Sequence, residues 1–336
     1  MKSILLVLPL TLAFAPGALA QADFYQGKTI NIVVGFTPGG TYDQMARFYA
    51  RHLPRFLPGK PNVIVQNMPG AGSMIAATHM FNAAPKDGTA LGVLGGGTVW
   101  EAALGNPRAK YDPRQFNWLV GKSRDNITCL VWHTSPVQTI EDVVRRETSV
   151  GATGPGSRTV SFPRALNELV GTRFKIVSGY PGGNEITLAL EKGEVEGYCG
   201  WALGSLKQRA MNWYNEKKVR FLVQFAPKGD PDLKGVPLAV DLAKTDEARQ
   251  IMEFLTSDAT LAWTALTTPG VPAERVKLLR TALAQILKDK DALAEADREK
   301  LEIDPVSGEE LQALVEKLYA TPTATLDAIR RLNDTK

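Results

Sequence analysis

A glycine-rich turn between a strand-like run and a helix-like run constrains this chain most. The apolar run Thr29 to Val34 leads to Gly35, Gly39 and Gly40 lie in the loop, and an amphipathic helix pattern begins near Asp43. Such a turn leaves backbone N–H groups unpaired at a helix N-terminus, where the helix dipole favours an anion. The pattern predicts an α/β fold with an anion-binding loop, and a plain tight turn is the alternative.

Three further turns have a similar composition. They cover Asn67 to Ser73, Gly95 to Thr98 and Thr153 to Ser157. None of them is specific alone, because glycine is common in turns of every kind. Four such turns in one α/β chain suggest a cleft in which main-chain groups hold a small carboxylate.

The first twenty residues have the pattern of an export signal. Lys2 supplies the positive start, Ile4 to Ala15 the apolar core, and Ala18 to Ala20 the small-residue cleavage site. The apolar core is too short for a stable membrane span. We expect residues 1–20 to be removed after Ala20 and the protein to be periplasmic; a retained helical anchor is the alternative.

The charge of the chain is nearly balanced. Removal of Lys2 leaves 38 of the 39 basic residues against 35 acidic ones, a net charge of +3. The basic residues are scattered and not interleaved with aromatic ones, which argues against nucleic-acid binding. A hydrophobic share of 44% in 336 residues indicates an ordered protein large enough for two domains.

Two cysteines and three histidines are the candidates for redox or metal chemistry. Cys129 and Cys199 lie in strand-like segments, so we expect a disulfide, with two buried thiols or a reactive or metal role as alternatives. His52, His79 and His133 have no zinc-ligand spacing. No metal site and no cofactor are predicted.

Nine strand-like runs, from Ile30–Val34 to Phe221–Phe225, alternate with helix-like runs. This order predicts mostly parallel sheets with helices on both faces. Residues 121–126 and 226–237 have turn or extended character and are expected to connect two lobes. Lobe 1 would comprise 21–124 and 228–336, and lobe 2 would comprise 125–227, as in a hinged clamp. Two consecutive domains divided near 125 are the alternative.

The last eighty residues are expected to be nearly all helical and to carry no site. Catalytic motifs are missing from the sequence as well. There is no Gly-x-Ser-x-Gly elbow, no dinucleotide fingerprint and no Walker lysine. The acidic cluster Glu191, Glu194 and Glu196 fits a solvated helix end followed by a strand. We therefore expect no enzyme; a secreted α/β hydrolase or lyase remains as a third hypothesis.

Candidate ligand-binding residues come from the glycine-rich turns and their neighbours. Asp43 is expected to cap a helix or to contact the ligand, Ser73 to do either, and Trp201 to line the cleft or the core. Arg158 is interpreted as a surface residue, with pairing to a carboxylate as the alternative. The candidates of lobe 1 are Phe36, Thr37, Gly39, Gly40, Thr41, Asp43, Ala71, Gly72, Ser73, Gly97 and Thr98. Those of lobe 2 are Thr153, Gly154, Ser157, Tyr180, Gly183 and Trp201.

Several segments together resemble the Bug-type extracytoplasmic solute receptors of tripartite tricarboxylate transporters. They occur in the family's order and span nearly the whole mature chain. Ser73 departs from the family pattern, which commonly has two glycines after Pro-Gly-Ala. The segments are Val33–Arg47, Val65–Ser73, Pro85–Thr89, Gly179–Gly183, Leu190–Glu196 and Pro269–Arg275.

The resemblance implies a two-lobed periplasmic binding protein of type II, a hinged clamp without enzymatic activity. It also implies a small ligand, often a carboxylate, held by loop backbones and ordered waters and delivered to a membrane permease. A monomer is expected. A sensory receptor of the same fold remains an alternative. By this likeness Phe36, Thr37, Gly40, Asp43, Ala71, Gly72 and Ser73 line one side of the site, and Gly154, Ser157 and Tyr180 face them.

Overall fold

The computed structural model describes residues 24–121, 126–154, 157–226, 228–301 and 303–334. The predicted signal segment 1–20 lies outside them, as does most of the first predicted connection between the lobes. The strands are β1 (Thr29–Val34), β2 (Asn62–Asn67), β3 (Ala90–Leu94), β4 (Asn117–Gly121), β5 (Ile127–Trp132), β6 (Thr148–Ala152), β7 (Phe174–Ser178), β8 (Gly197–Ala202), β9 (Val219–Phe225), β10 (Thr264–Thr267) and β11 (Val306–Ser307). The helices are α2 (Thr41–Phe56), α3 (Met74–Asn82), α4 (Gly97–Ala103), α5 (Ile140–Arg145), α6 (Arg158–Val170), α7 (Gly183–Glu191), α8 (Leu203–Arg209), α9 (Met211–Asn215), α10 (Asp246–Thr256), α11 (Asp258–Leu261), α12 (Ala273–Ile286), α13 (Lys290–Arg298), α14 (Gly308–Tyr319) and α15 (Thr323–Asp334).

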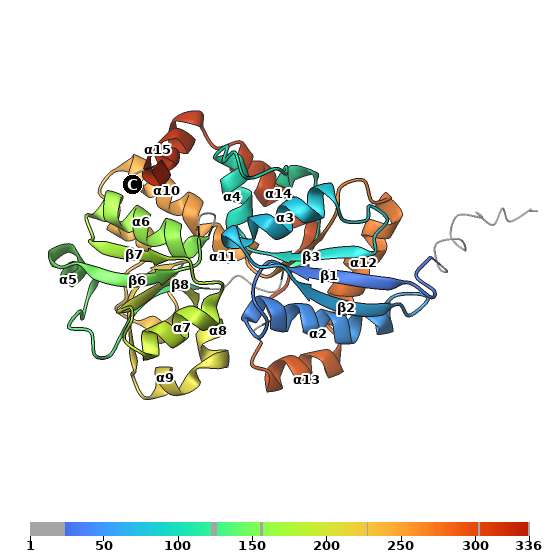
Figure 1. Ribbon diagram of the computed structural model, residues 1–336, viewed down its shortest axis with the longest axis horizontal. Coiled ribbons are helices and arrows are strands. Elements are labelled where there is room, and N and C mark those ends of the chain that lie inside the picture. The colour runs from blue at the N-terminus through green and yellow to red at the C-terminus, as the bar shows by residue number, and fades with distance from the viewer. Residues whose placement is uncertain (1–23, 122–125, 155–156, 227, 302, 335–336) are drawn as a thin grey trace, which may run out of the picture.

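The strands form two separate sheets, one in each lobe (Figure 1). The sheet of lobe 1 has the order β11-β4-β10-β3-β1-β2, and that of lobe 2 has the order β7-β6-β8-β5-β9. Helices cover both sheets, so the predicted two-lobed α/β architecture is confirmed. The nine predicted strands are present. β10 and β11 were not predicted, because they are short and lie between strong helix patterns.

Both sheets are mixed, which corrects the prediction of mostly parallel pairing. In lobe 1, β1 pairs in parallel with β2 and β3, whereas β10 pairs antiparallel with β3 and β4. In lobe 2, β6 pairs in parallel with β7 and β8, whereas β5 pairs antiparallel with β8 and β9. The cause is the chain's route: β4 and β9 are the last strands before the chain changes sheet, and β5 and β10 are the first strands after it. The strand by which the chain enters a sheet is therefore antiparallel to the strand by which the chain leaves that sheet.

The helix that follows the first glycine-rich turn shows how the sequence pattern becomes a core. Met45, Phe48, Tyr49 and Leu53 are buried and recur at intervals of three or four, so they form one face of α2. This face packs against β1, β2 and α12. Pro54 lies in the last turn, and the helix ends at Phe56. The core therefore fixes the start of α2 at the edge of the sheet.

The C-terminal part of the chain serves both lobes. α12 packs on α2 and β4, and α14 packs on β4, but α10 and α15 pack on α6 of lobe 2 (Figure 1). The chain thus returns to the sheet of lobe 1 at β10, after α10 has packed on lobe 2. The lobe boundaries at 124 and 228 themselves stay a prediction.

A disulfide joins Cys129 of β5 to Cys199 of β8. The two residues face each other across the antiparallel pair, and neither is exposed. Gly200 and Trp201 follow directly in β8. The bond therefore lies immediately beside a part of lobe 2 that borders the pocket described next.

Candidate functional site

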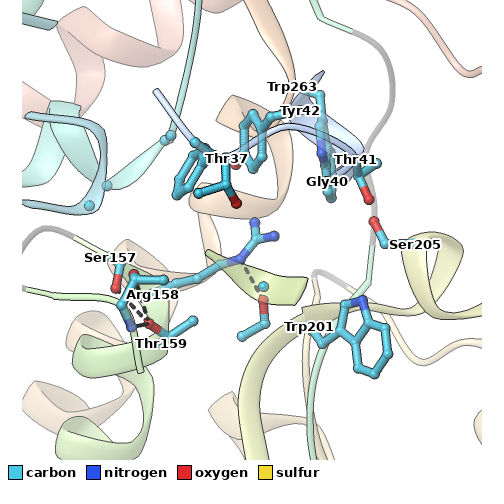
Figure 2. A pocket seen from close by; sticks show the side chains of 18 of the residues that line it. Thr37, Gly40, Thr41, Tyr42, Ser157, Arg158, Thr159, Trp201, Ser205 and Trp263 are labelled. Atoms are coloured by element: carbon cyan, nitrogen blue, oxygen red, sulfur yellow. Dashed lines mark hydrogen bonds between the residues drawn. The ribbon is translucent and has the colours of Figure 1, made fainter. Parts of the chain in front are cut away.

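A pocket lies between the two lobes, and both lobes line it (Figure 2). The space open to the centre of a water molecule is about 80 Å³. This space accommodates several waters or a small organic molecule. The lining residues are Phe36, Thr37, Gly40, Thr41, Tyr42, Gly72, Gly95, Gly96, Gly97, Thr153, Ser157, Arg158, Thr159, Gly183, Tyr198, Gly200, Trp201, Ser205, Arg209 and Trp263.

The loop after β1 forms the wall of lobe 1, and Asp43 holds this loop from behind. The carboxylate of Asp43 accepts the backbone N–H of Gly39 (2.8 Å) and the side-chain amide of Asn67 (2.9 Å). Arg47 adds an ion pair at 2.9 Å. Burial alone would raise the pKa of Asp43, but the hydrogen bonds from Arg47, Gly39 and Asn67 lower it below its usual value. Asp43 does not line the pocket; it orders the loop that does.

The start of α2, the end at which a helix has unpaired N–H groups, lines the pocket. The N-cap, Gly40, offers no side-chain cap, and Gly40, Thr41 and Tyr42 all line the pocket. The helix dipole favours an anion at this end. The ring of Tyr42 lies 4.4 Å from that of Phe36, tilted against it, and stacks on Trp263 at 5.5 Å between centroids. This wall therefore combines N–H donors with an aromatic surface.

The second and third glycine-rich loops pack tightly against the first. The N–H of Gly95 donates to the hydroxyl of Ser73 (3.2 Å), and Ser73 itself is fully buried. A Cβ on Gly35 would lie 1.6 Å from the Ser73 hydroxyl, so only glycine fits there. Ser73 thus joins three loops rather than lining the pocket, whereas Gly72 and Gly97 do line it.

In lobe 2, side-chain hydroxyl groups contact one another where β6 ends and α6 begins. Thr159 accepts the N–H of Thr153 (3.0 Å) and lies 2.6 Å from the hydroxyl of Ser157. Ser157 also donates to the carbonyl of Gly154 (2.8 Å). These groups position the turn and leave the adjoining Arg158 to project into the pocket (Figure 2).

Arg158 lies inside the pocket, which corrects its interpretation as a surface residue. Its Nε donates to the carbonyl of Gly200 (2.7 Å), and its guanidinium lies 5.2 Å from the ring centre of Trp263. Gly200 has a φ of +94°, and a Cβ there would lie 2.9 Å from Arg158. The backbone conformation of β8 at Gly200 therefore leaves room for the side chain of Arg158.

A second arginine reaches the pocket from α8. Burial lowers the pKa of Arg209, which has no carboxylate within ion-pair distance among the described residues. Tyr198 feels the positive charge of both Arg158 and Arg209: its own burial raises its pKa, and the two arginines oppose that rise. The two guanidinium groups thus share one neighbourhood.

The predicted candidates divide into two groups. Seven of them are not among the lining residues: Gly39, Asp43, Ala71, Ser73, Thr98, Gly154 and Tyr180. Ten of them line the pocket: Phe36, Thr37, Gly40, Thr41, Gly72, Gly97, Thr153, Ser157, Gly183 and Trp201. Trp201 also belongs to the core of lobe 2, where it stacks on Tyr198 at 5.4 Å. As ligand contacts, all of these residues stay predictions.

The remaining lining residues come mostly from side chains that carried no sequence signal. Trp263, just before β10, corrects the expectation that the last eighty residues carry no site. Ser205 and Arg209 lie four residues apart on α8, and only the tertiary fold directs this face to the pocket. Gly95 and Gly96 lie in a loop that the sequence did indicate.

The lobes touch each other beside the pocket. The side-chain amide of Asn184 donates to the carbonyl of Pro38 (3.1 Å), and the hydroxyl of Thr37 points to Glu185 at 3.5 Å. A pocket between two α/β lobes, with lining groups from both, is the arrangement found in two-lobed solute-binding proteins. Within the described residues there is no cluster of His, Cys, Asp or Glu suited to a metal ion.

Comparisons with known proteins agree with this class. A UPF0065 protein of Cupriavidus necator is 28% identical over 223 residues, 60% of this chain and 63% of that protein. The match thus spans less than two thirds of that relative. BugT of Bordetella pertussis (strain Tohama I) is 48% identical over 58 residues, 17% of each chain. No protein-family model matches.

Solved structures share the fold. The periplasmic binding protein BugD has a TM-score of 0.71 and 19% identity, over 92% of this chain and 99% of that one. MatC from Rhodopseudomonas palustris with bound malate has a TM-score of 0.70 and 21% identity, over 90% and 99%. These similarities confirm the predicted resemblance to Bug-type solute-binding receptors. BugD is a periplasmic binding protein and MatC holds malate, which agrees with the expectation that the chain is not an enzyme.

Proposed function

We propose that this protein is a periplasmic receptor that captures a small organic carboxylate between its lobes. The ligand would then be delivered to the membrane permease of a tripartite tricarboxylate-type transporter. The receptor acts as a monomer, after cleavage behind Ala20. Within the described residues, no helix has the length and apolar character that a bilayer span requires.

One observation carries the proposal: the charge character of the pocket wall. None of the described lining residues is acidic, and two are arginines. The remaining polar groups are hydroxyls and glycine backbone, all able to donate hydrogen bonds. Such a set favours an anion, because charge-assisted hydrogen bonds compensate the loss of its hydration.

Size and likeness support a carboxylate as this anion. The pocket has room for a small organic molecule, which suits a small organic acid. MatC, which shares the fold, has malate bound. Capture follows from the lobe contacts: a ligand that binds both walls stabilises the closed arrangement relative to an open one.

Thermal-shift measurements on the mature protein test this function. The panel comprises succinate, malate, citrate, adipate, glutamate, benzoate and terephthalate, with glucose and ribose as neutral controls. At a ligand concentration of about 100 Kd, binding adds roughly 2.7 kcal/mol and raises the Tm by several degrees. A rise with sugars and with none of the acids would overturn the proposal.

A further inference from the structure

A second and wider hollow, the outer hollow, lies between the lobes and shares one residue with the pocket. α8 of lobe 2 borders it on one side, and α2 and the end of α13 of lobe 1 border it on the other (Figure 1). The space open to the centre of a water molecule is about 520 Å³. No hydrogen bond or ion pair between described residues crosses it. Its lining residues are Gln44, Arg47, Arg51, Gln208, Arg209 and Glu299.

The shared residue is Arg209, which lines both the pocket and the outer hollow. It makes no hydrogen bond and no ion pair with a described residue, although the charge of Glu185 acts on it from a longer distance. Burial of a cation costs free energy unless an anion approaches it. A guanidinium has five N–H donors, enough for a ligand oxygen in the pocket and a carboxylate in the outer hollow.

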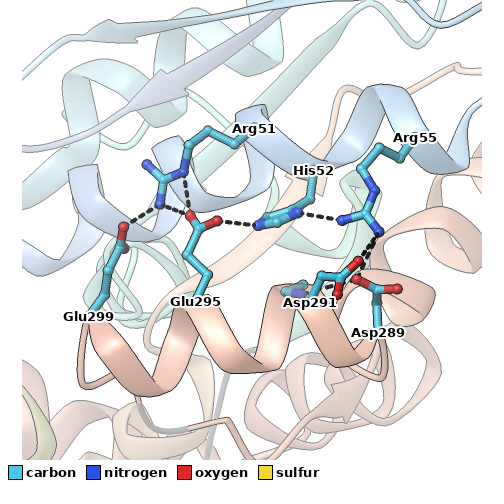
Figure 3. Close-up of polar contacts among 8 residues, drawn as sticks. Arg51, His52, Arg55, Asp289, Asp291, Glu295 and Glu299 are labelled. Atoms are coloured by element: carbon cyan, nitrogen blue, oxygen red, sulfur yellow. Dashed lines mark hydrogen bonds and ion pairs between the residues drawn. The ribbon is translucent and has the colours of Figure 1, made fainter.

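Lobe 1 supplies a carboxylate on the opposite side of the outer hollow. Glu299 follows α13 directly, and its Oε1 accepts a hydrogen bond from Arg51 at 2.6 Å (Figure 3). No described residue contacts its Oε2. Arg51 has a second partner, Glu295, at 2.5 Å. Glu299 therefore has a free oxygen for another cation, and a change in its position would not leave Arg51 unpaired.

An unpartnered amide oxygen lies on the same side. The Oε1 of Gln44 is closed off from solvent and has no hydrogen-bond partner within the described residues. Gln44, Arg47 and Arg51 recur at intervals of three and four, so they share one face of α2. Gln208 lines the outer hollow from the other lobe. A buried polar atom without a partner costs free energy, which an N–H donor brought close by closure would recover.

We propose that the outer hollow forms a latch for the closed protein: on closure Glu299 pairs with Arg209, and the side-chain amides of Gln44 and Gln208 meet. The proposal rests on the proposed capture of a ligand between the lobes. It adds residues that act without touching the ligand, because Gln44, Gln208 and Glu299 do not line the pocket. An anion from solution is a poorer partner for Arg209 here, since Glu299 repels it and is itself tethered at the site.

Two opposite charges at Gln208 test the latch. Gln208→Glu places a carboxylate opposite Arg47 and Arg51 and should bind terephthalate about 3-fold more tightly than the wild type. Gln208→Lys should bind it about 3-fold more weakly. Direct attraction between residue 208 and an anionic ligand would give the reverse order. Calorimetric titration measures both, with malate as the probe if terephthalate gives no thermal shift. Equal affinities or the reverse order overturn the latch.

Glu299→Gln tests the ion pair itself. It should weaken terephthalate binding about 5-fold at low salt, and the difference from the wild type should shrink to less than about 2-fold in 1 M NaCl. Glu295→Gln is the matched control, because it removes the other carboxylate partner of Arg51 but does not line the outer hollow. It should bind as the wild type does. Equal losses in the two variants would assign the effect to Arg51 and contradict the latch.

Small-angle scattering distinguishes failure of the latch from failure of the proposed function. Gln208 makes no hydrogen bond within the described residues, so neither substitution removes one. Without ligand and at low salt, Gln208→Glu should have a smaller radius of gyration than Gln208→Lys. If no acid of the thermal-shift panel binds, the proposed function fails, and this comparison still decides on the latch. If acids bind but the radii and affinities of the two variants agree, only the latch fails.

Discussion

The two walls of the pocket hold an anion by different means. Lobe 1 offers backbone N–H groups at the start of α2, on a loop that Asp43 orders from behind. Lobe 2 offers the guanidinium groups of Arg158 and Arg209. Backbone N–H groups donate hydrogen bonds to almost any carboxylate. The guanidinium groups of Arg158 and Arg209 instead distinguish ligands by charge and shape. The comparison suggests that lobe 1 supplies general anion affinity and lobe 2 supplies specificity.

The disulfide beside the wall of lobe 2 gives the largest expected effect. The bond closes a loop over a sequence separation of 70, for which chain entropy gives about 4 kcal/mol of stability. Reduction of the wild-type protein should therefore increase hydrogen exchange in β5 and β8 but not in β1 and β3. Terephthalate binding should weaken, because Gly200 follows Cys199 directly. Peptide mapping without reductant verifies the bond first.

The double variant Cys129→Ala/Cys199→Ala serves as the control for reduction. It has no bond to reduce, so reductant should leave its exchange pattern unchanged. If β1 and β3 respond to reduction as strongly as β5 and β8, the two walls are not independent, and the comparison is wrong.

Asp43→Ala gives the next effect, on the other wall. The substitution removes the acceptor of the Gly39 N–H, the Asn67 amide and Arg47, and it should cost about 3 kcal/mol of unfolding free energy. Urea unfolding measures this loss. Asp43→Asn keeps one acceptor oxygen and should cost clearly less. Both variants should weaken benzoate and terephthalate to the same degree, since the loop of lobe 1 does not select between them.

A selective loss of terephthalate in Asp43→Ala would contradict this division of roles. The specificity would then depend on lobe 1 as well.

The wall of lobe 1 was largely predictable from the sequence, and the wall of lobe 2 was not. Glycine at positions such as Gly40 and Gly72 predicts turns from the local sequence. The order strand, turn, helix then places such turns at one edge of a sheet. The charged side chains depend on tertiary packing. Arg158 enters the pocket because Gly200 bends the neighbouring strand, and no local pattern records that contact.

Trp263 and the mixed sheets were missed for a related reason. Trp263 has a φ of +54° and precedes a strand of four residues, in a region where helix patterns dominate. Its role depends on the chain returning to lobe 1 after covering lobe 2. Return strands run opposite to the strands that leave, so the antiparallel pairs follow from the route of the chain. Periodicity alone does not show this route.

A variant that hinders closure of the lobes should have a smaller effect. It tests the contact between the two walls of the pocket. A Cβ at Gly182 would lie 2.3 Å from the hydroxyl oxygen of Thr37 in the other lobe, and Gly182 is extended, with a φ of −165°. Gly182→Ala should therefore fold normally but resist closure, and terephthalate affinity should fall about 10-fold. In small-angle scattering, the ligand-bound variant should have a larger radius of gyration than the ligand-bound wild type.

The double variant Gly182→Ala/Thr37→Ala removes the opposing hydroxyl and is the matched test of this clash. It should recover the compact shape at saturating terephthalate. A radius that stays large in the double variant would assign the effect to α7 itself rather than to the contact between lobes.

The smallest effect concerns an ionic network between α2 and α13 of lobe 1 (Figure 3). Glu295 of α13 contacts Arg51 and, at 3.0 Å, His52 of α2, and His52 lies 3.1 Å from Arg55. Burial alone would raise the pKa of Glu295, but the hydrogen bonds and charges of Arg51 and His52 lower it below its usual 4.5. A carboxyl whose pKa is lowered on folding stabilises the protein above its unfolded pKa, and this contribution is lost as the pH falls through the folded value. Glu295→Gln should thus cost about 0.5–1 kcal/mol at pH 6 and almost nothing at pH 3.

Urea unfolding of the wild type and Glu295→Gln at pH 6, 4.5 and 3 measures this difference, and a gap that widens toward low pH would contradict the ionised pair. Terephthalate affinity at pH 6 is the decisive companion measurement. α2 carries the backbone donors of lobe 1 at its first turn and this network in its third and fourth turns, so a locally fixed wall predicts unchanged binding in Glu295→Gln. If binding falls along with stability, the anion-binding end of α2 depends on how α13 holds the opposite end. General anion affinity would then be a property of the whole lobe rather than of one loop.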